Sequence, residues 1–262
     1  MQTIALDRDD RGVITLTLDR PDRANAMTAT MFEELDEVAR SIVADHDARV
    51  LVITGAGRAF CAGYDLDDAE EIPRMSGMSF LGLQERGARA LTALRTLRVP
   101  VIAAVNGAAA GGGLALALAA DIRIGSPAAK FNAAFTKIGF SAGDLGTSWL
   151  LPRLIGPAVA AELAYTGRMV DAEEAERIGL LNSVHDDALE AALAMAEVIC
   201  GNSRNGVEFS KRALQSNLEV SSYAAAIDLE NRGQAFLTRG DDIVEALTAV
   251  AEKRAPRFGG VN

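Results

Sequence analysis

The stretch from Val99 to Ala120 constrains the fold of this chain more than any other part of the sequence. It is almost wholly apolar, but a proline, an asparagine and three consecutive glycines interrupt it, so it cannot form one membrane-spanning helix. Val101–Val105 is typical of a short buried strand, and Gly111-Gly112-Gly113 opens a helix of alanine and leucine. Ile122–Ile124 then resumes strand character, and this alternation predicts an α/β fold.

The flanking segments extend this pattern in both directions. Alternating residues within 3–18 predict a β-hairpin, helical spacing predicts helices over about residues 28–45 and 83–97, and Arg49–Thr54 is typical of a buried strand. From residue 186 onward helical spacing dominates, over 189–199, 207–218, 223–237 and 241–253. We therefore expect an α/β core domain over residues 1–185 and a helical C-terminal region over residues 186–262.

Composition and charge argue against several classes of protein. Hydrophobic residues make up 49% and charged residues 24% of the chain, which is ordinary usage for a globular protein. The formal net charge of −10 argues against a nucleic-acid partner. The two cysteines and two histidines lack the spacing of a zinc site, so no metal is expected. The first residues lack the basic and apolar segments of a signal peptide, so we expect a cytoplasmic protein without a membrane partner.

Two glycine-containing loops are the candidate functional segments. Arg58–Leu66 follows the strand predicted at residues 49–54, and Val105–Ala115 contains the three consecutive glycines. Glycine lets a backbone approach a ligand closely, and a helix N-terminus leaves several N–H groups free to stabilise negative charge. Tight packing between a helix and a strand is the alternative explanation, and the spacing does not match a dinucleotide-binding or phosphate-binding loop.

Several motifs follow one another along almost the whole chain. They are Arg20-Pro21 with Asn25-Ala26, Ile53-Thr54-Gly55, Phe60–Leu66, Asn106–Gly113, Tyr165–Arg168 and Lys253–Phe258. In this order they resemble the crotonase superfamily of enoyl-CoA hydratases and isomerases. The resemblance implies a crotonase-like spiral of ββα turns, a helical C-terminal region used in trimerisation, and a homotrimer or a dimer of trimers. It also implies an acyl-CoA thioester substrate and no separate cofactor, because coenzyme A is part of the substrate.

The same resemblance assigns an oxyanion hole to the backbone N–H groups of Tyr64 and Gly112. Removing a proton beside a thioester, or adding water to its conjugated alkene, places negative charge on the thioester oxygen. Fixed N–H donors stabilise that charge, and the loss of one such donor typically slows a reaction roughly 10²–10³-fold. This feature identifies thioester activation and leaves the reaction itself open.

A further set of positions resembles the family's contacts with coenzyme A. These positions are Arg23, Ala24, Arg58, Ala62, Leu66 and Lys253. The cations among them would meet phosphate groups, and the lysine would do so from the tail of a neighbouring subunit. The alanines and the leucine would contribute backbone or apolar contacts. The alternative is that the cations are solvated surface charges.

Two positions depart from the pattern of the family. A typical hydratase carries one glutamate three residues after the central glycine of its GGG and another about twenty residues further on, where this chain has Ala115 and Phe135. Methyl and phenyl groups can neither activate water nor protonate carbon. The hydration mechanism that uses two glutamates is therefore not expected, and Phe135 becomes a candidate substrate contact, as does Trp149 further along the chain.

One acid remains in this neighbourhood, Asp144, within the segment Gly139–Trp149. The segment resembles the aspartate-bearing loops of dienoyl-CoA isomerases, of ring-epoxide isomerases and of 4-chlorobenzoyl-CoA dehalogenase. A carboxylate against Phe135 and Trp149 would have its proton affinity raised by desolvation, which suits a proton shuttle. The alternative is that Asp144 caps a helix that begins near Leu145.

These features favour double-bond isomerisation in fatty or aromatic acyl-CoA metabolism, with Asp144 as the single acid and base. Three other interpretations stay open: an atypical enoyl-CoA hydratase, a hydrolase or dehalogenase that uses Asp144 as a nucleophile, and a non-catalytic acyl-CoA binder. The sequence leaves the acyl group and the choice between trimer and hexamer undetermined.

Overall fold

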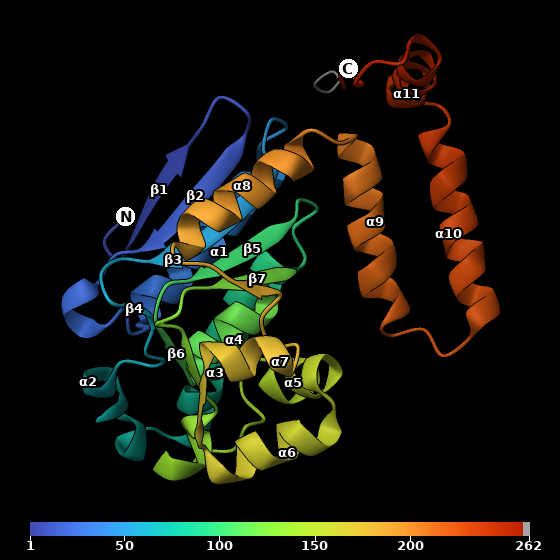
Figure 1. Cartoon of the computed structure of the whole chain (residues 1–262). Coiled ribbons are helices and arrows are strands. Elements are labelled where there is room, and N and C mark those ends of the chain that lie inside the picture. Colours follow the sequence, from blue (N-terminus) through green and yellow to red (C-terminus); the bar gives the residue numbers. More distant parts are fainter. Residues whose placement is uncertain (259–262) are drawn as a thin grey trace.

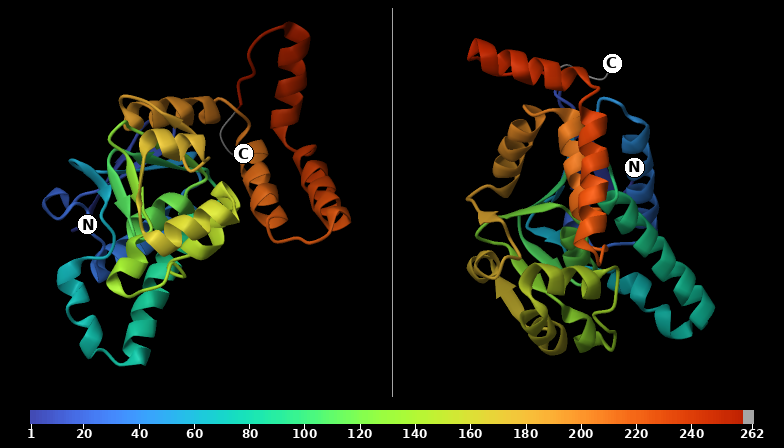
Figure 2. Two further views of the ribbon diagram at one scale, coloured as in Figure 1. Left: turned by 60° about the horizontal axis from the view of Figure 1, so that its bottom comes forward. Right: turned by 90° about the vertical axis from the view of Figure 1, so that its right-hand side faces the viewer.

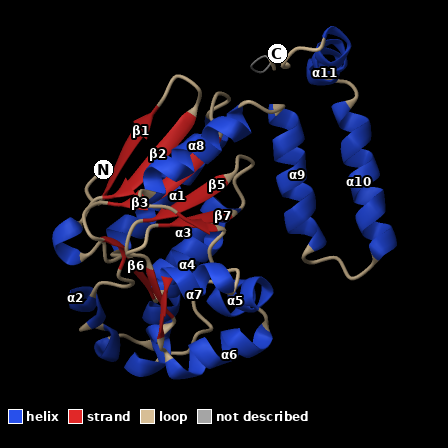
Figure 3. Cartoon of the chain, in the orientation of Figure 1, coloured by secondary structure: helices blue, strands red, loops and turns tan. Residues whose placement is uncertain are grey.

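The larger of two β-sheets forms one side of the molecule (Figures 1 and 3). The structure is a computed structural model that describes residues 1–258 of the 262-residue chain, without the side chains of Leu66 and Ala69. In spatial order the six strands of this sheet are β1 (Ile4–Arg8), β2 (Val13–Leu18), β3 (Val50–Gly55), β5 (Val101–Val105), β7 (Ile122–Gly125) and β10 (Ser183–Val184). Strands β1 and β2 form the predicted antiparallel hairpin, and the later neighbours pair in parallel.

A smaller sheet holds the strands that lead toward the site. In spatial order they are β4 (Ala59–Cys61), β6 (Ala108–Ala110), β8 (Lys130–Asn132) and β9 (Met169–Asp171). Strands β3, β5 and β7 of the larger sheet are each followed in the chain by a strand of the smaller one, and helical segments then return the chain. The predicted α/β spiral of ββα turns is therefore confirmed.

Strand β3 shows how the larger sheet separates two apolar cores. Successive side chains of a strand point to opposite faces, so Leu51 and Ile53 join the main core while Val50 and Val52 join a second, smaller one. Helix α8 (Ala188–Cys200) covers the second face with a row of alanines. Burial on both faces explains why all of β3 is apolar or small.

The main core packs helices against the inner face of the larger sheet (Figure 1). Its helices and those around it are α1 (Ala29–Ala44), α2 (Leu66–Ala69), α3 (Gly77–Arg95), α4 (Gly112–Ala119), α5 (Thr147–Ile155), α6 (Pro157–Thr166) and α7 (Ala172–Arg177). Thr28 starts α1, because its side chain accepts a hydrogen bond from the N–H of Met31. Every residue of α4 is buried, as its alanine and leucine composition predicts.

Three C-terminal helices project from this body (Figures 1 and 2). They are α9 (Arg204–Asn217), α10 (Tyr223–Leu237) and α11 (Asp241–Glu252), close to the helices that spacing predicts. They expose many large apolar side chains, among them Leu214, Tyr223, Phe236, Val244, Leu247 and Val250. Trimerisation through this region, and the division of the chain after residue 185, remain predictions.

A buried lysine attaches α9 to the body. The ammonium group of Lys211 donates to the carbonyl of Val99 at 2.8 Å and pairs with the carboxylate of Asp121 at 2.7 Å. Asp121 in turn accepts the N–H of Val101 at 2.8 Å. The aspartate that ends α4 therefore has a structural role, and it links this helix, strand β5 and α9.

Candidate active site

The loop after β4 directs the N–H of Tyr64 away from Met27, the residue with which Tyr64 is bridged. Met27 donates its N–H to the carbonyl of Gly63 at 2.7 Å and accepts the N–H of Asp65 at 2.8 Å. These two hydrogen bonds form a parallel bridge between Met27 and Tyr64. In such a bridge the N–H of the bridged residue points to the opposite side, so the N–H of Tyr64 is directed away from Met27.

The first N–H groups of α4 lie across from this loop. Gly112 begins α4, and the first four N–H groups of a helix have no partner within it. A Cβ atom on Gly63 would lie 3.4 Å from the nitrogen of Gly112 and 2.7 Å from the oxygen of Ala110, so the two loops approach closely. Gly63 also has a φ of +99°, which favours glycine. Tyr64 and Gly112 both line one cavity.

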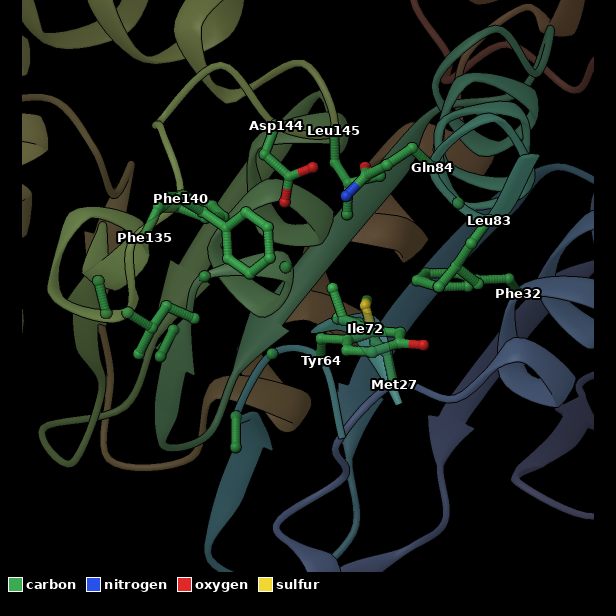
Figure 4. A pocket seen from close by; sticks show the side chains of 18 of the residues that line it. Met27, Phe32, Tyr64, Ile72, Leu83, Gln84, Phe135, Phe140, Asp144 and Leu145 are labelled. Atoms are coloured by element: carbon green, nitrogen blue, oxygen red, sulfur yellow. The ribbon is translucent and has the colours of Figure 1, made fainter. Parts of the chain in front are cut away.

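This cavity, of about 230 Å³, is mainly apolar (Figure 4). Its larger side chains include the aromatic residues Phe32, Phe80, Phe135 and Phe140, and the aliphatic residues Met27, Ile72, Leu83, Ile138 and Leu145. The rings of Phe80 and Phe140 stack with their centroids 5.7 Å apart, which joins α3 to the segment before α5. The cavity therefore suits an apolar or unsaturated acyl group.

Asp144 is the only carboxylate among the lining residues that the structure describes. Figure 4 shows its carboxylate directed into the cavity. Burial raises the pKa of this group above its ordinary value, although hydrogen bonds from the side chain of Gln84 and from the backbone of Leu145 act in the opposite direction. A carboxylate with a raised pKa binds and releases a proton closer to neutral pH.

The alternative role of Asp144 as a helix cap is wrong. Helix α5 begins at Thr147, its N-cap residue is Gly146, and no side chain caps it. Asp144 contributes only its carbonyl oxygen, which accepts the N–H of Thr147 at 2.8 Å. Leu145 and Gly146 both have positive φ angles, and these two residues delay the start of the helix. The carboxylate therefore remains available to the cavity.

Neither of the positions that lack the family's glutamates offers an acid to the cavity. Ala115 lies one turn into α4, is fully buried and does not line the cavity. Phe135 does line it, as predicted, and its ring lies 3.8 Å from where a Cβ atom on Gly111 would be. A carboxylate enters the cavity instead from the next loop, at Asp144.

Trp149 is not part of the cavity wall. The sequence predicts a contact with Asp144, but the indole of Trp149 is 42% exposed and the guanidinium of Arg153 lies 3.2 Å from its ring centroid. The late start of α5 is the physical reason. Each residue of a helix is rotated by about 100° from the one before, so a start after residue 146 changes the direction in which Trp149 points.

Three of the positions assigned to coenzyme A, Arg23, Ala24 and Ala62, lie close together, and Ala62 lines the cavity. The N–H of Ala62 donates to the carbonyl of Ala24 at 3.0 Å. Arg23 pairs with Asp65, at 3.4 Å, and with Asp67, so a phosphate would have to compete with these carboxylates. These contacts join the segment that holds Arg23 and Ala24 to the loop after β4, and the contacts with coenzyme A remain predictions.

The remaining predicted contacts are spread over the surface. Arg58 is exposed at the turn before β4. Lys253 is exposed at the end of α11, on the projecting C-terminal helices (Figure 1). It is not among the residues that line the cavity of its own chain. The side chain of Leu66 lies outside the described part of the structure.

Sequence reasoning missed Gln84, which lines the cavity beside Asp144. Gln84 lies on α3 one turn before Gly87 and two turns before Leu91, both of which are buried. A single glutamine on this otherwise apolar stripe was the available signal. The stripe was hard to recognise because glycines occupy several positions near the start of α3.

Over residues 1–258 the structure shows neither a cluster of metal-ligating side chains nor a helix that could span a membrane. Within this range the structure shows no group of three or more histidine, cysteine, aspartate or glutamate side chains that could hold a metal ion. No helix in the same range combines the length and the hydropathy needed to cross a membrane.

The two sheets, the close approach of Gly63 to Gly112 and the apolar cavity with the carboxylate of Asp144 in its lining define an α/β spiral protein with a small-molecule cavity. The family model for enoyl-CoA hydratase/isomerase matches residues 8–261. A probable enoyl-CoA hydratase of Mycobacterium bovis is 44% identical over 253 residues, which cover 94% of this chain and 89% of that protein. The 1,2-epoxyphenylacetyl-CoA isomerase of Escherichia coli is 38% identical over 263 residues, which cover 99% and 100% of the two chains.

Solved structures agree with these relatives. A probable enoyl-CoA hydratase/isomerase from Mycobacterium abscessus has a TM-score of 0.91 and 39% identity, and the match covers 99% of this chain and 100% of that one. The chain therefore belongs to the enoyl-CoA hydratase/isomerase family, has the crotonase fold and is an acyl-CoA enzyme of that family.

Proposed function

We propose that this enzyme moves a carbon–carbon double bond within an unsaturated acyl-CoA, with Asp144 as the single acid and base. The observation that carries the proposal is the position of Asp144 in the apolar cavity, where burial raises the pKa of its carboxyl group. The N–H groups of Tyr64 and Gly112 border the same cavity and would receive the thioester oxygen.

The proposed reaction balances without any co-reactant. The carboxylate of Asp144 removes a proton from the carbon beside the thioester: the C–H bond breaks, an O–H bond forms, and the electron pair moves onto the thioester oxygen. The two N–H groups stabilise this enolate. The electron pair then returns through the conjugated chain, Asp144 gives the proton to the γ-carbon, and the carboxylate is regenerated.

Two further observations support isomerisation over hydration. Hydration needs a group that activates water in addition to the one that protonates carbon, and Asp144 is the only carboxylate among the described lining residues. One relative is an isomerase by name, although others are named as probable hydratases. The aromatic lining and this relative together favour a second candidate, the isomerisation of a ring-bearing acyl-CoA such as 1,2-epoxyphenylacetyl-CoA.

The test is to incubate the purified protein in deuterated water with crotonyl-CoA, 3-hexenoyl-CoA, a 3,5-dienoyl-CoA and 1,2-epoxyphenylacetyl-CoA, and to follow each by NMR. We expect double-bond migration with deuterium incorporation and no net hydration. A 3-hydroxyacyl product as the main outcome would refute the one-acid mechanism.

The matched control is Asp144→Asn, which keeps the shape of the side chain and removes its ability to take a proton. We expect turnover to fall at least about 10³-fold while binding of a saturated acyl-CoA stays within about twofold. Retained turnover would refute the assignment of Asp144. A trapped acyl-aspartyl adduct at Asp144, detected by mass spectrometry, would show a nucleophile instead of a proton carrier.

A further inference from the structure

Gln84 faces Asp144 across the cavity. It lies on α3 and lines the cavity, and Figure 4 shows its amide reaching toward the carboxylate. A hydrogen bond from the side chain of Gln84 lowers the pKa of Asp144, against the larger effect of burial. Within the described part of the structure no charged side chain contributes to this pKa. The phenol of Tyr64, whose own pKa is raised by burial, is the other titratable side chain of the lining.

Glycine at position 87 lets α3 approach the Asp144 loop. A Cβ atom on Gly87 would lie 3.0 Å from Cδ2 of Leu145 and 3.2 Å from Cζ of Phe32, so the leucine occupies the space that a larger residue would take. Leu145 also lies 3.5 Å from where a Cβ atom on Gly112 would be. It has a φ of +46°, which is unfavourable for leucine.

This packing fixes the position of Asp144 relative to two elements. Leu145 contacts α3 at Gly87 and the start of α4 at Gly112, and Asp144 precedes it directly. Gln84 lies one turn before Gly87 on the same face of α3, where its amide meets the carboxylate. A positive φ at a leucine persists only when its surroundings hold it in place, which points to a constrained site.

We propose that Gln84 is the positioning residue of Asp144: its amide N–H binds one carboxylate oxygen and leaves the other free to exchange a proton with the substrate. The consequence for catalysis rests on the proposed function, whereas the contact itself does not. In an apolar cavity the amide is the side-chain donor that stabilises the ionised form, and ionised Asp144 is the base of the first step.

The test compares Gln84→Met with Glu85→Met. The first removes the amide and keeps a similar volume, whereas the second introduces the same side chain at the next, exposed position of α3. Infrared difference spectra against Asp144→Asn isolate the carboxyl bands of Asp144 in the free protein, so its titration is read without turnover. In Gln84→Met we expect this titration to move to higher pH, because the ionised form has lost a donor. Glu85→Met should titrate as the wild type does.

Kinetics with 3-hexenoyl-CoA give the second readout. In Gln84→Met we expect kcat to fall about tenfold with KM within about twofold, and the acid limb of the pH profile to move to higher pH. If Gln84→Met folds poorly, Gln84→Glu keeps the length of the side chain and should move the titration of Asp144 even further upward, because like charges disfavour ionisation.

An unchanged titration of Asp144 in Gln84→Met or Gln84→Glu would overturn the proposal, whatever the activity. A shifted titration together with full turnover in Asp144→Asn would support the Gln84 contact and refute the proposed function instead. The two failures are therefore distinguishable.

Discussion

Replacing Gly63 by alanine tests the close approach of the two loops that carry the proposed oxyanion N–H groups. An alanine there would have to adopt a φ of +99°, which disfavours any L side chain by roughly 1–2 kcal/mol. Its Cβ atom would also lie 2.7 Å from the backbone oxygen of Ala110, which cannot rotate away as a side chain can. Displacing this backbone adds about 1–3 kcal/mol. We expect the free energy of unfolding to fall by about 2–5 kcal/mol.

Two further glycines separate the contributions to this loss. Gly139 also has a positive φ, +83°, but a Cβ atom there would meet nothing within 4 Å, so Gly139→Ala should cost only about 1–2 kcal/mol. Gly82 lies within α3 and is likewise open, so Gly82→Ala should be neutral or stabilise the protein by up to about 1 kcal/mol.

The assay is urea unfolding of the wild type and the three variants at one protein concentration, followed by circular dichroism. In thermal unfolding Gly63→Ala should lower the Tm on the order of 10 °C. Its kcat should fall roughly 10²–10³-fold, because the N–H groups of Tyr64 and Gly112 would no longer converge on the proposed position of the thioester oxygen. If Gly63→Ala costs no more than Gly139→Ala, the loops do not approach as described, and this account of the oxyanion hole is refuted.

Three further predictions concern charged groups. Because burial raises the pKa of Asp144, we expect the acid limb of kcat/KM in a pH series to lie above the range of an ordinary aspartate; a limb near the ordinary value would contradict this. Burial disfavours the ionised form of Asp65, but hydrogen bonds, chiefly from Arg20, outweigh this effect and hold the pKa of Asp65 low. The pair therefore stabilises the fold above the pKa of Asp65 in the unfolded state, and this stability is lost as the pH falls through its pKa in the folded state. In urea unfolding Arg20→Met should therefore cost about 1–3 kcal/mol at pH 7 and less at pH 3, and an equal loss at both would count against the pair. Lys211→Met leaves the partly buried Asp121 without its cation and should lower the free energy of unfolding by about 1–3 kcal/mol in the same assay. An unchanged free energy of unfolding would mean that other contacts alone hold α9.

Local sequence patterns predicted the elements whose burial is clear. The strand at residues 49–54 and the helix at 28–45 appear as β3 and α1 within a residue or two, because an unbroken apolar run marks a strand buried on both faces and apolar spacing marks the one buried face of the helix. Helix α3 was predicted to begin at Leu83 but begins at Gly77, where Ser76 accepts the N–H of Ser79. The exposed first turns of α3 bury little, so they leave no periodic signal.

The lining residues that lie in a recognisable sequence motif could be predicted, whereas those brought to the cavity only by packing could not. Tyr64, Gly112 and Asp144 line the cavity as expected, since each lies in a loop with a recognisable pattern. Gln84 could not be found this way, because its meeting with Asp144 depends on how closely two distant segments pack. Trp149 was misplaced because two successive residues with positive φ delay α5, and one of them is a leucine, which seldom adopts such an angle.

The choice between isomerisation and hydration depends on what could hold a water molecule. An ordered water in an apolar cavity needs roughly 2–4 polar partners. At the position of Phe135 the cavity presents a ring, and the side chain of Gln84 is already engaged with Asp144. An acyl chain that fills the rest of this space would exclude water from the carbon atoms beside Asp144. The carboxylate then has only substrate carbons with which to exchange its proton, and this arrangement favours migration of the double bond over addition of water.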